Sequence, residues 1–567
     1  MTAEPDAARP RLRPGVAVTP LREGLHLRGR ATSLTLEGSR ALPALWRVLA
    51  LRLGPDAAAA ATTAGPELGP EAAAALAAVT ARLREHGLLV DHPDGQRLPP
   101  WPGAVAEDPG GAAAALAAAR PVVAAADPDG PAARAVARAL ARGGTAAPAV
   151  RAEPGLPAER VVLAAEGPTG RPVAVAVQTG PDAGFVTAPA DPARARADAA
   201  ALAARLGLDE DAAAGGSAAP PTSPAPPAPP TLRALLAAAA AQRLLCAVAG
   251  LPDPGDPAQD PRLLAGRPSV LVAEARPPHA EHRPWAAGPG GVAAPPRDLA
   301  EALRRVDALG DARLGVVDAP APGGLPQLPV PLVSCDTPSG PLVAGAVRTD
   351  LARLAAACRC VELHLAAAGG GAAPVVGVDP DHALGRALRR AVPGRPGRGA
   401  RAVPEAAWRE HPQAGHWYGV LARRLGRAPD LAVRRLGGEE VYLAQVQGAR
   451  AVEATAADAV AHAALAALTR LLARGAGLVA VHHATPCGAA APLAAAGRTP
   501  AAWADPGWAD RWLADAAARE PDLHAALVRL TGLRTVRWRP VTAEARRYAD
   551  ALDGCGFTAL LPVEHRP

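Results

Sequence analysis

The spacing of apolar residues changes within the first hundred positions, and this change constrains the fold more than any other feature. Three segments alternate at strand period: residues 16–18, 25–28 and 34–37. Two runs with helical spacing follow at residues 42–53 and 70–86, and the second returns as a short apolar segment at residues 88–91. The pattern predicts a winged-helix-like α+β module whose third strand and last helix form a groove. An extended peptide could add to that groove as another strand.

The order of these segments resembles a known module. The stretches VAVTPLREGLHLRG, SLTLEG, ALWRVLALRLG and LREHGLLVD are similar to the precursor-peptide recognition element of enzymes that modify ribosomally made peptides. In that family the leader peptide pairs with the third strand and packs on the last helix. The resemblance implies these leader-peptide-binding residues: Leu34, Thr35, Leu36, Val79, Leu83 and Arg84. An ordinary winged helix that packs on its own neighbour or binds DNA fits the same residues equally well.

Composition excludes several kinds of chemistry. The chain contains no lysine, so all 60 basic side chains are arginines, and neither a phosphate-binding P-loop lysine nor a Schiff-base lysine is available. The 60 arginines face 54 acidic residues, and this balance is too even to indicate a nucleic-acid partner. Few aromatic side chains are present to stack on bases. We therefore expect no nucleic acid among its partners.

The cysteines and the amino terminus indicate a soluble cytoplasmic protein. The six cysteines form neither a dense disulfide framework nor a CxxC pair, as expected of reduced thiols. The first residues are acidic where a signal peptide would be basic, and no apolar run reaches membrane-spanning length once alanine is discounted. We expect no membrane partner.

Residues 98–290 predict a second domain of alternating strands and helices. Strands are expected at residues 121–126, 160–164, 172–177 and 184–187, with a helix at 131–142, which is typical of a doubly wound, Rossmann-like α/β layer. The first turn, Asp127-Pro128-Asp129-Gly130, carries carboxylates where a dinucleotide needs backbone N–H groups. A magnesium site on the two aspartates is one interpretation, but a turn closed by local hydrogen bonds is favoured. No metal or other cofactor is expected here.

A proline-rich insert at residues 212–230 is followed by a helix at 231–250, a strand at 269–273 and His282-Arg283-Pro284-Trp285. This order resembles the ThiF-like proteins of azole-forming peptide pathways, which are related to adenylating enzymes. The glycine-rich nucleotide loop and the CxxC zinc motifs of adenylating members have no counterpart in the sequence. The resemblance therefore implies a degenerate ThiF-like domain that does not adenylate.

The last predicted domain, residues 291–567, resembles the YcaO cyclodehydratases in four segments: AGAVRTDLARLAAACRCVELHLA, VGVDPDHALGRALRRAV, ATAADAVAHAALAALTRLLA and TVRWRPVTAEARRYADALDGCGFTALLPV. Active members hold magnesium and ATP phosphates with clustered Glu and Gln. Here Glu362 stands alone and Arg386, Arg389 and Arg390 follow, so the resemblance implies a catalytically silent relative. A solvated Glu362 and a hydrogen-bonded His364 are favoured over a site on their helix.

Three smaller features complete the candidates. Cys358 and Cys360 are two residues apart on a predicted helix, so they face different directions and cannot chelate as a pair. Residues 386–401 hold six arginines and no acid, which predicts a mobile cationic loop that either binds an acidic partner or is merely solvated. In residues 481–487, VHHATPC, a strand end packed in a core is favoured over a metal site, and a cysteine nucleophile beside a histidine is a third option.

The sequence thus predicts a multidomain α/β protein with domains at residues 1–97, 98–290 and 291–567. The preferred function is a non-catalytic, leader-peptide-binding subunit of an ATP-dependent, azoline-forming cyclodehydratase, as in thiopeptide pathways. Its partners would be the precursor peptide and a separate YcaO-type enzyme, and a homodimer stays open. The alternative is a drifted adenylating or flavin-dependent peptide-tailoring enzyme. A winged-helix regulator is a third reading, although residues 70–86 carry only two arginines.

Overall fold

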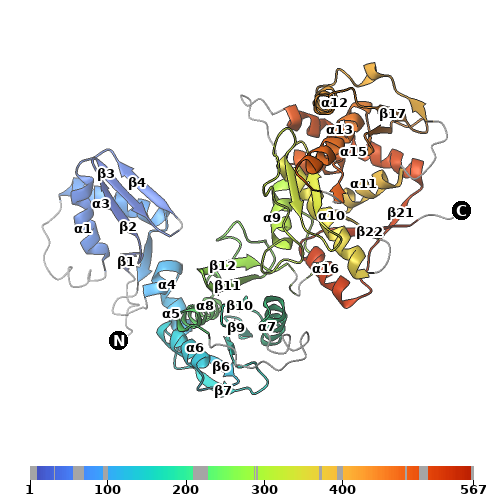
Figure 1. Ribbon diagram of the computed structural model, residues 1–567. Helices are drawn as coiled ribbons and strands as arrows, with labels where there is room; N and C mark the ends of the chain where they lie inside the picture. The colour runs from blue at the N-terminus through green and yellow to red at the C-terminus, as the bar shows by residue number, and fades with distance from the viewer. Residues whose placement is uncertain are drawn as a thin grey trace, which may run out of the picture. The chain divides into compact units, whose positions relative to one another are not determined.

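The described part of the chain forms two compact units (Figure 1). The first comprises residues 1–256 and 270–281, and the second comprises residues 257–269 and 282–567. The structure is a computed structural model that describes residues 9–30, 32–54, 69–92, 100–208, 228–286, 288, 291–369, 373–392, 400–478, 482–496 and 508–563. Most of the proline-rich insert lies outside the described residues. The predicted division into three domains stays a prediction.

The N-terminal module, residues 9–92, contains the predicted strands and helices. Its antiparallel sheet has the order β2-β3-β4. The elements are β2 (Ala17–Leu21), β3 (Gly24–Arg28), β4 (Ser33–Glu37), α1 (Leu42–Leu53) and α3 (Pro70–Glu85). Leucines from all of these except β2 meet in one buried core: Leu25, Leu27, Leu34, Leu49, Leu53, Leu76 and Leu83. A further strand, β1 (Arg9–Leu12), pairs with β5 (Leu89–His92). The sequence did not predict β1, because RPRL shows no alternation of apolar residues.

A seven-stranded sheet follows in the order β12-β11-β10-β9-β8-β6-β7. Its strands are β6 (Val122–Ala125), β7 (Ala149–Ala152), β8 (Arg160–Glu166), β9 (Pro172–Thr179), β10 (Ala183–Val186), β11 (Ser269–Ala275) and β12 (Pro278–Pro284). The helices of this region are α4 (Pro100–Val105), α5 (Pro109–Ala118), α6 (Pro131–Arg142), α7 (Pro192–Leu206) and α8 (Pro230–Val248).

The predicted doubly wound, Rossmann-like arrangement is wrong for this sheet. Only β6 and β7 pair in parallel, joined by the crossover helix α6, whereas β6–β8, β8–β9, β9–β10 and β10–β11 are antiparallel. The connections at residues 167–171 and 180–182 are too short to carry a crossover, so they can only make hairpins. Five of the seven strands lie where the sequence predicted them, whereas β7 and β12 were not predicted. The short gaps between the predicted strands at residues 160–164, 172–177 and 184–187 already excluded crossovers, and the predicted parallel layer overlooked them.

Helices cover both faces of this sheet. α6 and α8 share a buried core with alternate residues of β9, including Val175 and Val177. The residues between them, such as Ala174 and Ala176, point to the other face, where α7 packs on β9. Burial on both faces explains why β9 is apolar throughout rather than alternating.

The second unit holds three small sheets, with the orders β13-β14-β20, β15-β22-β21 and β16-β17-β18-β19. Their strands are β13 (Leu332–Cys335), β14 (Leu342–Gly345), β15 (Val375–Gly377), β16 (Arg401–Ala402), β17 (Leu431–Arg435), β18 (Tyr442–Val446), β19 (Ala449–Glu453), β20 (His482–Ala484), β21 (Arg534–Arg537) and β22 (Thr558–Val563). The helices are α9 (Leu299–Leu309), α10 (Thr349–Gly369), α11 (Pro380–Ala391), α12 (Pro412–Leu425), α13 (Ala456–Gly475), α14 (Ala491–Ala495), α15 (Trp508–Thr531) and α16 (Ala543–Gly554), with short 3₁₀ helices η3 (Glu405–Ala407) and η4 (Gly488–Ala490).

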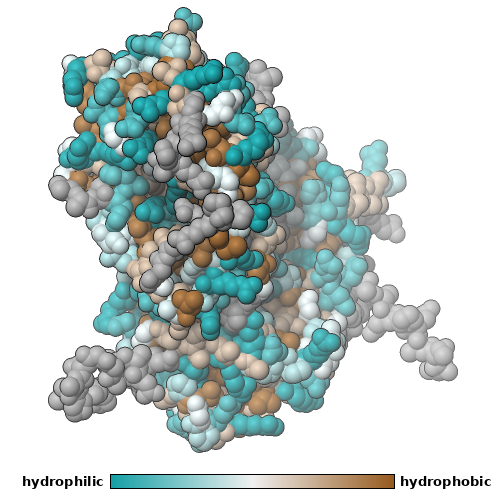
Figure 2. All heavy atoms as spheres, turned by 90° about the vertical axis from the view of Figure 1, so that its right-hand side faces the viewer, coloured by the Kyte–Doolittle hydropathy of each residue, from teal (hydrophilic) through white to brown (hydrophobic). Residues whose placement is uncertain are grey.

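In the part of the chain that the structure describes, two helices, α8 and α13, are long and apolar enough to cross a membrane by length and composition. The apolar window of α8 is 56% buried and that of α13 is 83% buried inside the protein. α8 packs on β9 and α13 packs on β18, β19 and α12, so both act as core helices of their units. Hydrophilic and hydrophobic residues are interspersed on the face drawn in Figure 2.

We predict that Gly184→Ala destabilises the seven-stranded sheet. A Cβ atom at this position in β10 would lie 2.6 Å from the carbonyl oxygen of Gln178 on β9 and would also meet Leu236. Overpacking of this kind costs about 1–3 kcal/mol. Gly155→Ala is the matched control, because nothing lies within 4 Å of its added Cβ. The melting temperature should fall for the first variant only, and equal melting of both variants would contradict the packing of β10 on β9.

Candidate functional site

The outer edge of β4 is open among the described residues, because β4 pairs only with β3. The Gly29 N–H donates to the Thr32 carbonyl at one end of this hairpin (2.8 Å), and the Gly38 N–H donates to the Glu23 carbonyl at the other (3.1 Å). Hydrogen-bonded pairs alternate in an antiparallel ladder, so Leu34 and Leu36 bond to β3. The backbone groups of Ser33, Thr35 and Glu37 therefore point outward.

The opposite edge of the same sheet is less suited to pairing. The backbone N–H and C=O groups of Leu25 and Leu27 on β3 bond to β4. By the same alternation, the backbone groups of Val18 and Pro20 on β2 point away from β3, toward the open edge. Pro20 has no N–H group, and proline on an edge strand blocks the addition of another strand. β4 has no proline, so it is the edge that can accept a guest strand.

The six predicted leader-binding residues have different environments. Leu34 and Leu83 are 4% and 0% exposed and belong to the core of the N-terminal module. Leu36 and Val79 are partly buried against that core. Thr35 is exposed, and its Oγ1 lies 2.9 Å from Nδ1 of His26 on the neighbouring strand. Arg84 is exposed as well and forms a 3.8 Å ion pair with Asp91.

The start of β4 lies beside the end of α3. The Thr32 hydroxyl, just before β4, donates a hydrogen bond to the carbonyl of His86 (2.7 Å). Gly29, in the same turn, lies against the side chain of Leu88, because an added Cβ would be 2.7 Å from it. The strand and the helix that the sequence predicted as the two sides of a groove thus meet at one end.

A second site lies in the second unit, at a cavity of about 470 Å³ that we call the arginine pocket. Its lining includes Arg359, Arg386, Arg389, Arg390, Arg450, Arg470, His483, Thr485, Pro486 and Cys487. The residues come from α10, α11, β19, α13, β20 and the segment after β20. No carboxylate appears in the described lining.

Helix α11 places three of these arginines. It begins after Asp379, whose side chain accepts a hydrogen bond from the backbone N–H of His382 (2.6 Å) and so caps the helix. Arg386 and Arg390 are one turn apart on one face, and Arg389 lies beside them. This part of the predicted cationic loop is therefore helical, and residues 393–399 of that loop lie outside the described residues.

Glu362 on α10 is the shared partner of three arginines. Its carboxylate lies 3.0 Å from Arg359, 3.0 Å from Arg386 and 2.8 Å from Arg390, and it also accepts the N–H of Val376 (3.1 Å). Burial would raise the pKa of this fully buried carboxyl group, but Arg386 and Arg390 outweigh burial and lower the pKa. The expectation of a solvated Glu362 was wrong, because no single stretch of sequence contains its partners.

Arg389 is held between two further buried carboxylates. Its guanidinium group donates to Glu453 at 2.8 Å and to Glu520 at 2.7 Å. Burial opposes ionisation of Glu520, yet Arg389 and His524 lower its pKa to about 2. Glu453 also accepts the N–H of Gly488 (2.8 Å), which ties η4 to β19.

These carboxylates do not fit the magnesium–nucleotide chemistry of active YcaO enzymes. Mg²⁺ needs several oxygen ligands in octahedral geometry. Both oxygens of Glu362, Glu453 and Glu520 already accept hydrogen bonds from arginine. A metal ion would have to displace a buried guanidinium group, and no group of three or more potential ligands is found among the described residues.

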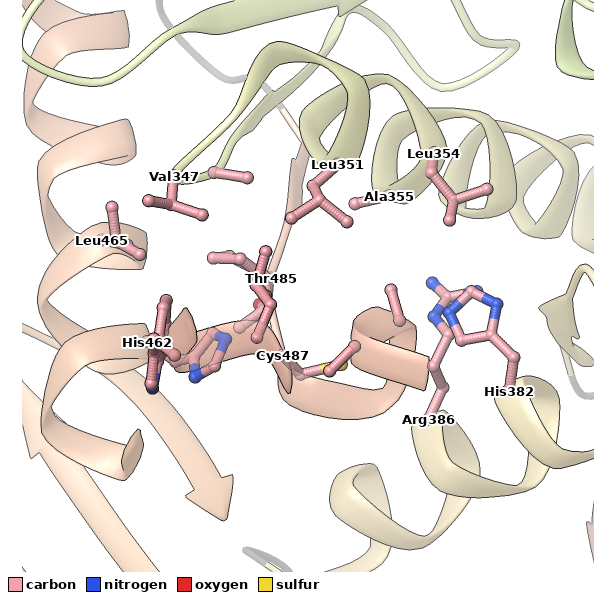
Figure 3. Close-up of a pocket in the computed structure, with 16 residues that line it drawn as sticks. Val347, Leu351, Leu354, Ala355, His382, Arg386, His462, Leu465, Thr485 and Cys487 are labelled. Atoms are coloured by element: carbon pink, nitrogen blue, oxygen red, sulfur yellow. The ribbon is translucent and has the colours of Figure 1, made fainter. Parts of the chain in front are cut away.

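A narrow apolar slot of about 30 Å³ adjoins the arginine pocket and shares Arg386 and Cys487 with it. α10 supplies Leu351 and Leu354 on one side, and Cys487 and His462 lie on the other (Figure 3). The slot has room for only about two water molecules. It cannot hold a substrate as it stands.

Cys487 lies where the slot and the pocket meet. Burial raises the pKa of its thiol, against the opposing charges of Arg389 and Arg386, so the thiol is protonated at neutral pH. Among the described residues no hydrogen bond joins this thiol to a histidine. His482 Nε2 lies 3.2 Å from the Ser339 carbonyl instead, and Nδ1 of His483 is buried without a partner.

Other sequence candidates are structural. The Asp127 side chain accepts the N–H of Asp129 (2.9 Å), and the Asp127 carbonyl accepts the N–H of Gly130 (3.1 Å), which confirms the local turn. Arg283 pairs with Asp311 at 2.6 Å. His364 Nδ1 lies 3.0 Å from the hydroxyl of Tyr548.

Cys358 and Cys360, the two cysteines on α10, lie in different surroundings. Cys358 is fully buried near the arginine pocket. Burial raises the pKa of its thiol to about 11, and the charges of Arg386 and Glu362 shift this pKa in opposite directions. The thiol of Cys360 instead points to the carbonyl of Asp336 at 3.6 Å. The prediction that they cannot chelate as a pair is confirmed by these separate environments.

Two arginines of the pocket lining, Arg450 and Arg470, and two glutamates behind it, Glu453 and Glu520, were not identified from sequence. They lie on β19, α13 and α15, far from α11 in sequence. Glu453 follows the apolar Val452 at the end of β19, and a lone acid in such a position was the only available signal for it. Glu520 follows Arg519 and precedes Asp522 by two residues, so its local sequence resembles a solvated helix face.

Comparisons with known proteins add little to this geometry. No protein-family model matches the sequence, and no curated protein matches it. A structure described as "Heterocyclase in complex with substrate and Cofactor" aligns with 98% of this chain and 94% of its own, at a TM-score of 0.46 and 11% identity. The structure of the heterocyclase TruD aligns over the same shares at a TM-score of 0.42 and 11% identity. TM-scores below 0.5 establish neither a shared fold nor a shared activity.

We predict that Arg389→Met destabilises the second unit at neutral pH. The variant leaves Glu453 and Glu520 buried without their guanidinium partner, which costs about 3–5 kcal/mol. A carboxylate whose folded pKa is depressed contributes stability above its unfolded pKa of 4.5 and loses it as the pH falls toward 2. The deficit should therefore be large at pH 7 and smaller at pH 4, measured as the melting temperature.

The triple variant Arg389→Met, Glu453→Gln, Glu520→Gln is the control for this experiment. It removes the charges together and should recover most of the melting temperature at pH 7, because no buried charge is left unpaired. If Arg389→Met alone has the same melting temperature as the unaltered protein at pH 7, the ion-pair network is refuted.

Proposed function

We propose that this protein is a leader-peptide-binding subunit of an azoline-forming cyclodehydratase of thiopeptide type. It would hold the leader of a ribosomal precursor peptide and present the core of that peptide to a separate YcaO-type enzyme. That enzyme would use ATP to activate an amide while a Cys, Ser or Thr side chain closes the ring.

The observation that carries the proposal is the open edge of β4. Ser33, Thr35 and Glu37 direct backbone donors and acceptors outward along an uninterrupted strand. Strand addition draws its affinity from main-chain hydrogen bonds and its specificity from pockets for alternate side chains. The end of α3 beside this edge, with the partly buried Val79 on the same helix, offers an apolar surface to such side chains.

The leader-binding role also explains how a subunit without chemistry of its own could accelerate ring closure. Binding the leader converts each ring closure into a tethered event, with an effective concentration on the order of millimolar for a short flexible connection. The arginine-bound carboxylates of the second unit support assigning ATP-dependent chemistry to the partner enzyme, because their oxygens are already engaged. We further propose that the complex is cytoplasmic.

We predict that Thr35→Pro weakens leader binding at least tenfold. Proline removes an outward N–H from the centre of β4 and leaves the ladder with β3 intact, because Thr35 does not bond to β3 through its backbone. Thr35→Val keeps the N–H and should bind normally. The measurement is fluorescence polarisation with the labelled leader segment of any short Cys/Ser/Thr-rich precursor peptide that is found encoded beside this gene.

Val18→Pro tests the other edge of the same sheet. It places proline at an outward position of β2, so it disturbs the backbone in the same way and should leave leader binding unchanged. Tight binding by Thr35→Pro, or equal loss in Thr35→Pro and Val18→Pro, would contradict pairing at β4.

A further inference from the structure

The arginine pocket carries more positive charge than its ion pairs use. Six arginines line it, and three buried glutamates lie behind them: Glu362, Glu453 and Glu520. Three positive charges are therefore uncompensated by the described carboxylates. Burying like charges together is unfavourable unless an anion joins them.

The surplus charge faces the cavity. Arg390 keeps 40% of its side chain exposed and Arg359 keeps 28%, although both pair with Glu362. Arg450 is exposed on β19, and no carboxylate partner of it is found among the described residues. Arg470 is partly buried, and its guanidinium group donates to the neutral carbonyl of Gly448 (2.8 Å) and to no carboxylate among the described residues.

His483 offers a ligand in the pocket a hydrogen-bonding group. Burial lowers the pKa of His483, and the charges of Arg470 and Arg474 lower it further, so this ring is neutral at pH 7. Its buried Nδ1 has no hydrogen-bond partner among the described residues. An oxyanion that carries a proton, or a water molecule bound to it, would satisfy that nitrogen.

We propose that the arginine pocket binds a phosphate-type oxyanion, such as phosphate or diphosphate, without a divalent metal ion. Guanidinium groups recognise phosphate oxygens through paired N–H donors. Here such groups come from α10, α11, β19 and α13, a three-dimensional arrangement that suits a tetrahedral anion better than a planar carboxylate. The cavity of about 470 Å³ has the size of a small-molecule site.

The absence of free carboxylate oxygens makes this site different from a magnesium–phosphate site. In such a site the metal neutralises the phosphate, and acidic residues hold the metal. In the arginine pocket the glutamates hold arginines, and the arginines are left to neutralise the ligand. This inference does not depend on leader binding, which concerns the N-terminal module.

Isothermal titration calorimetry of the full-length chain with sodium diphosphate tests the proposal. We expect saturable binding that is unchanged by EDTA. Inorganic phosphate should bind more weakly because it carries less charge. The double variant Arg450→Gln, Arg470→Gln should bind diphosphate at least tenfold more weakly, and its melting temperature should be unchanged, because neither arginine takes part in the described buried ion pairs. Arg424→Gln, an exposed arginine of α12 outside the pocket, should bind normally.

Titrations with other ligands identify the source of the phosphate group. A nucleoside diphosphate that binds no more tightly than diphosphate indicates a free oxyanion, whereas tighter binding indicates that a nucleoside is attached; either result supports the proposal. Binding that requires Mg²⁺, absence of saturable binding, or selective binding of an acidic peptide would overturn it. Thr35→Pro should bind diphosphate normally, which separates a failure here from a failure of leader binding.

Discussion

A single buried carboxylate determines much of the second unit. Glu362 is fully buried on α10, and removing a lone charge from water would be very costly. Its oxygens are shared by Arg359, Arg386 and Arg390, so α10 and α11 are joined at one position, and the N–H of Val376 brings β15 to the same point. The second network, around Arg389, joins α11 to β19 and α15. Both networks form the inner wall of the arginine pocket, so the packing of this unit and its electrostatics have the same origin.

The sequence predicts local features well because they depend on neighbouring residues. The strands and helices of the N-terminal module follow from alternation at residues 25–28 and 34–37 and from helical spacing later on. The Asp127 turn follows from side-chain chemistry over four residues. The direction of the central strands in the seven-stranded sheet follows from the short connections at residues 167–171 and 180–182, which the prediction of a parallel layer did not take into account.

The arginine pocket shows the same limit at a site. Arg386, Arg389 and Arg390 stand out in the sequence as a cluster, but whether they are solvated or buried depends on partners more than 20 residues away. The nearest, Glu362, was identified but taken for a surface residue, and Glu520 lies 131 residues from Arg389. A predicted loop of arginines and a buried arginine network have the same local composition. Only the distant glutamates distinguish them.

The exclusive use of arginine has a physical consequence for this pocket. Buried lysines lose their charge readily, since burial can lower a lysine pKa by several units, whereas arginine stays protonated in proteins. Burial and neighbouring guanidinium groups do lower the pKa of Arg390, yet Glu362 opposes them. The wall of the pocket therefore stays cationic across the physiological range, and binding of an anion there would vary with the protonation of the anion rather than of the protein. In a lysine-lined pocket of the same shape, burial and like charges would lower the lysine pKa values before an anion binds, and part of the positive charge would be lost.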